Sequence, residues 1–257
     1  MKINFLQPTS LSEALEILNS PNSLPLAGGT YLNTPEYKSK LERRAGDAII
    51  TLVDLQYLGL DHIRKHGNNL EIDACVTLQQ LCENAHTPED LKKASKLETP
   101  VNIRNMATAA GTLFSSTGRS AFACAMLALD TKLIIEPGTV ESLLGNFLPL
   151  REESIPGKLI TKMTIPLNAS LAFEHVGRTK FDFPIVCAAV AKWTSGRTRL
   201  ALGGYGSSPL LAMDGTADDD IMTAARNGYH EAEDEWASAE YRADVAATLA
   251  GRCINRL

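Results

Sequence analysis

The sequence lacks an excess of positive charge and any long apolar run. Its 25 Lys and Arg residues are outnumbered by 30 Asp and Glu residues, giving a formal net charge of −5 over 257 residues. Proteins that grip nucleic acid phosphates are usually basic, so this balance argues against a nucleic acid partner. No apolar stretch approaches the roughly 18 residues that span a bilayer. The opening MKINFLQPTS has no basic segment followed by an apolar one. We therefore expect no secretory signal, no membrane association and a cytoplasmic location.

The cysteines lack the close pairing that metal sites use. There are five, none in a CxxC pair, and they lie singly among apolar residues, as in AFACAML and IVCAAVA. Thiolate ligands of zinc or iron–sulfur clusters usually come in close pairs. The sequence also has no HExxH, GxSxG, P-loop or GxGxxG motif. We expect no metal site, identify no catalytic residue, and interpret the cysteines as small buried side chains.

Apolar periodicity predicts a mixture of helices and strands. Helices are expected at residues 11–20, from Thr77 onward, 88–98, 121–129 and through the tail 218–257, where the acidic run 218–220 favours a helix start. Strands are expected at residues 24–26, 48–55, 68–78, 131–136 and 158–166, with a hairpin of 183–194 and 197–206 turned at Ser195-Gly196. This pattern predicts an α+β protein with mixed subdomains rather than one regular βαβ series.

Two segments rich in small residues are the candidate binding segments. The first is LAGGTYL, residues 26–32, where a strand runs into a Gly-Gly turn. Such a turn lets successive backbone N–H groups converge on an anion, and Thr30 adds a hydroxyl donor. The second is TAAGT, residues 108–112, which we expect to be a loop with the same properties. Together the two loops are expected to clamp a diphosphate from both sides.

Six motifs occur in one order along nearly the whole chain: LAGGTYL, VNIRNMATAAGT, AMLALD, LITKMTIP, RLALGGYGSSPLLA and SAEYRADVAATLAGR. In this order they resemble the FAD-binding medium subunit of molybdenum hydroxylases, the xanthine dehydrogenase and carbon monoxide dehydrogenase family. The resemblance implies an FAD-binding fold of the vanillyl-alcohol-oxidase (PCMH) type at residues 1–166, in two α/β subdomains of about 1–56 and 57–166. A small C-terminal domain of sheet and helices, residues 167–257, is implied to follow.

The resemblance also implies an oxidoreductase subunit that binds FAD on this chain. In that family a large subunit oxidises the substrate at a molybdopterin centre, and electrons reach FAD through two [2Fe–2S] clusters on a small subunit. The implied partners are therefore a large molybdopterin subunit and a small iron–sulfur subunit, in a dimer of heterotrimers. NAD or another acceptor would take the electrons from FAD. A subunit with this role needs no cysteine cluster of its own.

The cofactor-binding residues that the resemblance implies come from both segments and their surroundings. They are Leu26, Ala27, Gly28, Gly29, Thr30, Tyr31, Leu32, Arg104, Thr108, Ala110, Gly111, Thr112, Ser115, Ser120 and Ile160. Arg104 either faces the cofactor or makes a structural or interface ion pair. Tyr31 either packs beside the Gly turn or stacks on the flavin. Tyr241 and Arg242 of SAEYR either pack their helix or contact a neighbouring subunit.

The sequence departs from the family pattern at three places. The second segment usually reads T-x-G-G-N, whereas this chain has Ala110-Gly111-Thr112. The family tends to place a Ser-Asp pair before the apolar helix, with the Asp near ribityl or ribose hydroxyls. Here that stretch is Arg119-Ser120-Ala121, so Ser115, Ser116 or Ser120 is left as a weaker partner. Glu174-His175 also stands where the family often has a Lys.

These departures keep two further readings open. One is a non-catalytic assembly subunit of the same fold that has lost or weakened FAD binding. The other is an independent reductase similar to the UDP-N-acetylenolpyruvylglucosamine reductases. We rank that reductase lowest, because the Ser or Glu arrangement expected in its substrate domain is not seen.

Overall fold

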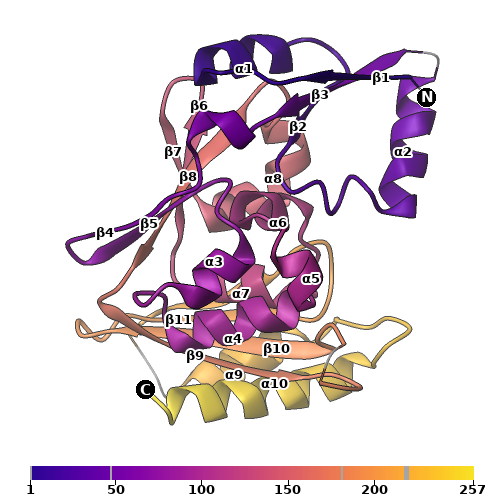
Figure 1. The fold of residues 1–257 in the computed structure, drawn as a ribbon. Coiled ribbons are helices and arrows are strands. Elements are labelled where there is room, and N and C mark those ends of the chain that lie inside the picture. Colours follow the sequence, from indigo (N-terminus) through magenta and orange to yellow (C-terminus); the bar gives the residue numbers. More distant parts are fainter. Residues whose placement is uncertain (1, 47, 181, 217–219) are drawn as a thin grey trace.

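The computed structural model describes residues 2–46, 48–180, 182–216 and 220–257, and these residues form three β-sheets with helices between and around them (Figure 1). The first sheet is parallel, with the order β1-β3-β2. The second has five antiparallel strands in the order β4-β5-β8-β6-β7, and the third has four in the order β12-β11-β10-β9. The mixture confirms the expected α+β class.

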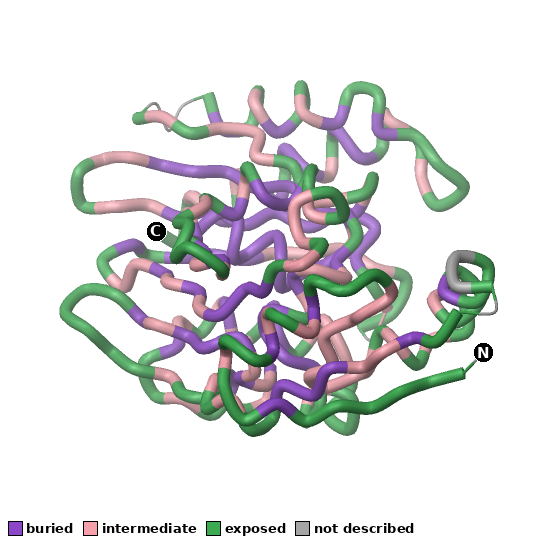
Figure 2. The backbone as a smooth tube through the Cα atoms, turned by 90° about the horizontal axis from the view of Figure 1, so that it is seen from above, coloured by how far each residue is buried: buried purple, intermediate pink, exposed green. Residues whose placement is uncertain are grey.

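The N-terminal sheet is covered by a helix on each face. It contains β1 (Lys2–Leu6), β2 (Ser23–Leu26) and β3 (Ile49–Asp54), and its helices are α1 (Leu11–Leu18) and α2 (Pro35–Ala45). Helix α1 packs Ala14 and Leu18 against Val53, whereas α2 packs Leu41 against Ile50. Val53 and Ile50 point to opposite faces because strand side chains alternate. Helix α2 was not expected from the sequence, and Thr34 caps it. The edge strand β1 is exposed along its length (Figure 2).

The five-stranded sheet forms the middle of the molecule. Its strands are β4 (Ile63–His66), β5 (Asn69–Asp73), β6 (Lys132–Glu136), β7 (Val140–Leu143) and β8 (Leu159–Pro166), preceded by a 3₁₀ turn, η1 (Gln56–Leu58). The helices of this region are α3 (Leu78–Glu83), α4 (Glu89–Glu98), α5 (Val101–Arg104), α6 (Ala109–Ser115), α7 (Ala121–Ala128) and α8 (Leu144–Ser154). Every residue of α7 is buried, so this helix lies at the centre of the core.

Two expectations for this middle region were wrong. The strand expected at residues 68–78 ends at Asp73, because the chain turns before Thr77 starts α3 with a capping box. The segment expected to be a loop at 108–112 is instead the beginning of α6, since the Thr108 side chain accepts from the Gly111 N–H and caps the helix. Pro88, expected in the first turn of its helix, directly precedes α4.

The C-terminal sheet is sandwiched between helices. It contains β9 (Ala169–Val176), β10 (Val186–Trp193), β11 (Thr198–Gly203) and β12 (Leu210–Gly215), and β10 and β11 form the expected hairpin. Alternate residues of β10 face two cores: Cys187 and Ala189 join the cluster around α7, whereas Ala188 and Val190 join the cluster of the last two helices. These helices are α9 (Ile221–Gly228) and α10 (Ala239–Ile254).

The expected tail helix is thus two helices separated by a turn. Of the acidic run at 218–220, Asp218 and Asp219 lie outside the described residues, and Asp220 directly precedes α9. Of the helices that the structure describes, none is both long enough and apolar enough to cross a membrane.

Candidate cofactor site

The loop at residues 26–32 lies against the backbone just before the segment at residues 108–112. A Cβ atom built on Gly28 would lie only 1.7 Å from the Met106 carbonyl oxygen and 3.3 Å from the Ala107 nitrogen. Only glycine leaves room for the loop at residues 26–32 to rest on this backbone, which leads directly into α6. The loop at residues 26–32 therefore lies against the backbone that directly precedes the second segment.

The loop at residues 26–32 keeps its amide groups free. It follows the carboxyl end of β2, where the Leu55 N–H donates to the Leu26 carbonyl (2.9 Å). Gly29 has a φ of +65°, a conformation that favours glycine. Within the described residues, the N–H groups of residues 28–32 donate to no acceptor, and Gly28 through Thr30 are half-buried. Successive unpaired N–H groups at the end of a strand can bind an anion such as a diphosphate.

The segment at residues 108–112 differs because its amide groups are already used. The Ala109 N–H donates to the Val76 carbonyl (2.8 Å), and the Ala110 N–H donates to the Ala74 carbonyl (3.3 Å). The Gly111 N–H donates to the Thr108 hydroxyl (3.2 Å). This segment is thus not the second set of free amides that we expected. It offers the hydroxyl of half-buried Thr112 instead, whereas the Ser115 hydroxyl already donates to the Gly111 carbonyl (2.9 Å).

Several of the predicted site residues have structural partners. The Arg104 guanidinium donates to the Gln79 side chain (2.8 Å) and to the Thr99 carbonyl (3.0 Å), which ties α5 to α3 and to the end of α4. Ile160 is buried in β8. The Ser120 hydroxyl, almost fully buried, accepts from the Ala123 N–H and caps α7.

Arg151 connects the candidate site to the C-terminal sheet. Its guanidinium donates to the carbonyls of Phe114 (2.9 Å), Ser116 (2.6 Å) and Ser207 (2.8 Å). Burial lowers the pKa of Arg151, and the nearby Glu152 and Tyr31 act in the opposite direction. Tyr31 therefore lies close to Arg151. The exposed ring of Tyr31 packs against the ring of Tyr37, with the two ring centroids 4.7 Å apart. Sequence reasoning missed Arg151. Its acceptors are all backbone carbonyls, which every residue has, so no residue pattern marks the contact.

Glu98 is a second residue that sequence reasoning missed. Its Oε2 atom accepts from the Ser120 hydroxyl (2.9 Å) and from the Phe122 N–H (2.9 Å), at the start of α7. Burial raises the pKa of Glu98 to about 7, against the opposing effect of these donors. A carboxylate from α4 thus lies beside Ala121, the position whose own side chain has no acceptor. The sequence does not predict the contact between Glu98 and the start of α7, because the two lie more than twenty residues apart along the chain.

Arg242 of the SAEYR motif has a packing role. Its side chain is fully buried, pairs with Asp234 (2.7 Å) and donates to the carbonyls of Ala232 (2.8 Å) and Ala237 (3.1 Å). Of the two readings of this motif, helix packing therefore holds for Arg242. The neighbouring Tyr241 is exposed.

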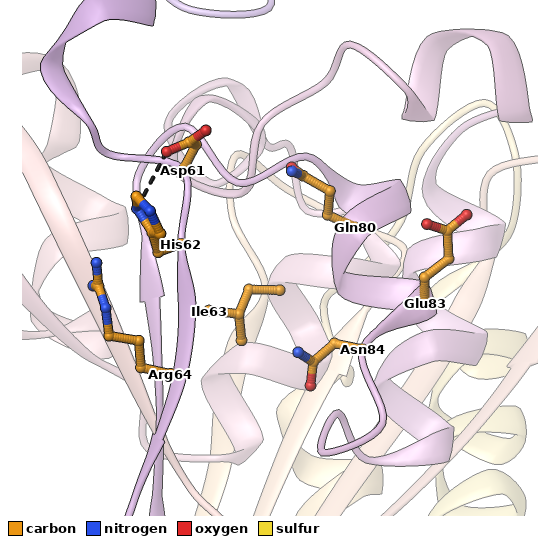
Figure 3. A pocket seen from close by; sticks show the side chains of 7 residues that line it. All are labelled: Asp61, His62, Ile63, Arg64, Gln80, Glu83 and Asn84. Atoms are coloured by element: carbon orange, nitrogen blue, oxygen red, sulfur yellow. Dashed lines mark ion pairs between the residues drawn. The ribbon is translucent and has the colours of Figure 1, made fainter.

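A polar pocket lies away from the glycine loop, between β4 and α3 (Figure 3). It has a volume of about 430 Å³ and is lined by Asp61, His62, Ile63, Arg64, Gln80, Glu83 and Asn84. These side chains already have partners in the chain: His62 Nδ1 lies 3.2 Å from Asp61, Arg64 pairs with Asp73 at 3.0 Å, and Glu83 accepts from the Gln79 side chain (2.6 Å). Among the described residues, no cluster of three or more His, Cys, Asp or Glu side chains could hold a metal ion.

An open glycine loop at the carboxyl end of a parallel strand is typical of nucleotide-binding proteins, because its free N–H groups suit a diphosphate. Residues 1–168 match the family model described as the FAD binding domain in molybdopterin dehydrogenase. The chain belongs to this family, and FAD is the cofactor of its N-terminal part.

Relatives support this assignment. The FAD-subunit of nicotinate dehydrogenase from Eubacterium barkeri is 31% identical over 153 residues, which cover 56% of this chain and 49% of that protein. The chain thus spans about half the length of this curated relative.

Solved structures show the same fold over the whole chain. Reconstituted CO dehydrogenase from Oligotropha carboxidovorans matches with a TM-score of 0.82 and 24% identity, over 100% of this chain and 97% of the other. Quinoline 2-oxidoreductase from Pseudomonas putida 86 matches with a TM-score of 0.80 and 21% identity, over 100% and 96%. The expected FAD-binding fold is confirmed.

Proposed function

We propose that this chain is the flavin subunit of a molybdenum hydroxylase-type dehydrogenase. The single observation that supports this most is the loop at residues 28–32, whose free N–H groups fit the FAD diphosphate. The Thr30 hydroxyl would add a donor, and the Thr112 and Ser115 hydroxyls would line the opposite side. The flavin, when bound, supplies the redox chemistry, while the residues of this chain bind and orient it.

The proposed electron path runs from two [2Fe–2S] clusters on a small partner subunit to FAD, and then to NAD or another acceptor. A large molybdopterin subunit would oxidise the organic substrate. The proposed assembly is a dimer of heterotrimers in the cytoplasm, and the nicotinate dehydrogenase relative, named as an FAD-subunit, supports a multi-subunit enzyme. Co-purification with the products of the adjacent reading frames tests these partners. Isolation of the chain alone, after co-expression with both, would contradict them.

The proposed domain division places FAD in residues 1–166 and a C-terminal domain at 167–257. The family match over residues 1–168 supports this boundary. Arg256 on the C-terminal side pairs with Asp90 of α4 at 2.9 Å, so the two proposed domains also contact each other directly. Expression of residues 1–168 alone, followed by FAD titration, tests whether the N-terminal part binds the cofactor by itself.

A second candidate function is an assembly subunit without bound FAD. The observation in its favour is that the amides of residues 109–111 are already hydrogen-bonded within the chain. Titration of the full chain with FAD separates the two. Flavin absorption bands at about 370 and 450 nm support the flavin subunit. So does a dissociation constant for FAD below about 1 μM. Absence of binding when FAD is added supports the assembly subunit.

A further inference from the structure

Glu98 has a carboxyl group with one oxygen committed and the other available. Its Oε2 atom accepts both the Ser120 hydroxyl and the Phe122 N–H, at 2.9 Å each. No other described side chain donates to Oε1, and this atom is not among the buried polar atoms that lack a partner. The residue as a whole is half-buried. A third donor, the Ala121 N–H, also acts on the carboxyl group and lowers its pKa. Oε1 is the oxygen to which no side chain of the described residues donates, so it is the atom that can accept from a ligand.

The carboxyl group also has no cation beside it. No Lys or Arg is among the groups that act on the pKa of Glu98. The two nearest arginines in the chain are engaged elsewhere: Arg104 with Gln79 and the Thr99 carbonyl, and Arg119 with the carbonyls of Phe183 (2.8 Å) and Pro184 (2.9 Å). Burying an unpaired carboxylate is costly, and its retention is typical of binding or catalytic positions.

Glu98 and the glycine loop lie at the two ends of one short segment. Glu98 is the last residue of α4, and the single-turn helix α5 leads from there to Met106, whose carbonyl contacts Gly28. Arg104 folds this segment back by donating to the carbonyls of Lys96 (3.4 Å) and Thr99 (3.0 Å). The carboxyl group is thus held on the same compact segment that supports the proposed diphosphate site.

We propose that Glu98 binds a hydroxyl group of FAD through Oε1, in the ribityl chain or in the ribose. Both sugar-like groups flank the diphosphate in FAD, and carboxylates are the usual acceptors for such hydroxyls. This inference rests on the proposed function. If the proposal holds, Glu98 at the end of α4 supplies a carboxylate at the start of α7, where α7 has none of its own.

The test compares wild-type chain with Glu98→Gln. The Phe122 N–H and the Ser120 hydroxyl hold the amide oxygen at the Oε2 position, so the NH₂ group replaces Oε1 and the free acceptor is lost. We expect the FAD dissociation constant, measured by flavin fluorescence, to rise about 10- to 100-fold. The matched control is Glu89→Gln, which changes an exposed carboxylate on the same helix and should leave FAD binding unchanged.

ADP as a second probe distinguishes the two hydroxyl sources. It contains the ribose and the diphosphate but no ribityl chain. If Glu98→Gln weakens FAD binding and leaves ADP binding unchanged, Glu98 binds the ribityl chain. Equal weakening for both ligands assigns it to the ribose. Unchanged binding of FAD by Glu98→Gln overturns the proposal, whereas a wild-type chain that binds no FAD overturns the proposed function instead.

Ser120→Ala tests whether Glu98 acts only by stabilising α7. This variant removes one donor to Oε2 and the cap of α7, yet it leaves Oε1 in place. We expect a lower melting temperature and a loss of FAD affinity clearly smaller than that of Glu98→Gln. A loss of FAD affinity as large as in Glu98→Gln would show that the effect comes from the helix start, and would overturn a direct contact.

Discussion

The loop at residues 26–32 and the segment at residues 108–112 have similar compositions but opposite hydrogen-bonding states. In the first, the N–H groups of residues 28–32 have no acceptor within the described chain. In the second, the N–H groups of Ala109 and Ala110 donate to carbonyls of residues 76 and 74. Glycine and small residues thus make an anion site sterically possible in both places. In the second segment, carbonyls of the neighbouring backbone accept from the N–H groups, so these groups are not free to bind an anion. Three predictions test this difference, and a fourth tests the buried carboxyl group of Glu98.

The largest expected effect belongs to Gly28→Ala. The new Cβ would lie 1.7 Å from the Met106 carbonyl oxygen, so one of the two segments must move. We expect the free energy of unfolding to fall by about 3 kcal/mol and FAD affinity to fall more than tenfold, as measured by urea titration and flavin fluorescence.

Gly111→Ala is the matched control for this substitution. Its Cβ would meet only the Thr108 side-chain oxygen, at 2.8 Å, and a side chain can adjust where a backbone cannot. We expect a change of no more than about 1 kcal/mol. If both substitutions were equally damaging, the distinction between the two segments would not hold.

The next effect is the pH dependence of stability caused by Glu98. Its pKa rises from an ordinary value near 4.5 to about 7 in the folded chain, so the folded state binds the extra proton between these values. The stability of wild type should therefore fall as the pH rises through this window, relative to Glu98→Gln, which cannot titrate. The difference should reach at most about 3 kcal/mol above pH 7.

Urea unfolding of both proteins at several pH values measures this difference. A difference that stays constant from pH 4.5 to 7 would mean that the carboxyl group has an ordinary pKa, and that it is not a desolvated, unpaired group.

A smaller effect separates the two threonines. Thr108→Ala removes the cap of α6 and should cost about 1 kcal/mol of unfolding free energy, with little change in FAD affinity. Thr30→Ala should do the reverse, because its hydroxyl has no hydrogen-bond partner among the described residues and belongs to the loop whose N–H groups are free. We expect about fivefold weaker FAD binding, from one neutral hydrogen bond, at nearly unchanged stability. Thermal melting and FAD titration of both variants measure these changes. Equal losses of FAD affinity in the two variants would contradict the expected difference between the two threonines.

The smallest effect is expected for Ala110→Gly, which restores a glycine that the T-x-G-G-N pattern of the resemblance has at this position. Because the Ala110 N–H already donates to the Ala74 carbonyl, extra backbone freedom should add nothing to FAD binding. We expect a loss of about 0.5–1 kcal/mol of stability, from the greater flexibility of glycine. A gain of more than threefold in FAD affinity would show that this backbone contacts the cofactor after all.

Local signals in the sequence predicted much of the framework. The helices expected at residues 11–20 and from Thr77 onward formed with Ser10 and Thr77 as their caps, since a cap depends on residues three positions apart. The hairpin at Ser195-Gly196 formed because its turn chemistry is also local. The start of α6 was missed because Ala, Gly and Thr residues show no apolar periodicity, although Thr108 is a good cap.

The candidate site was only half predictable for the same reason. The sequence identified Gly28 and Gly29 and placed them at the end of a strand. It gave no sign of Arg151 or Glu98, whose acceptors and donors lie on other helices and on the C-terminal sheet.

The sequence by itself determined the family, the α+β class and the positions where glycine or a capping hydroxyl is needed, because these depend on neighbouring residues along the chain. The tertiary structure alone decided which of the two small-residue segments keeps free N–H groups and where a carboxylate meets the start of α7. Those outcomes depend on the carbonyls of Ala74 and Val76 and on the end of α4, which only folding brings into reach.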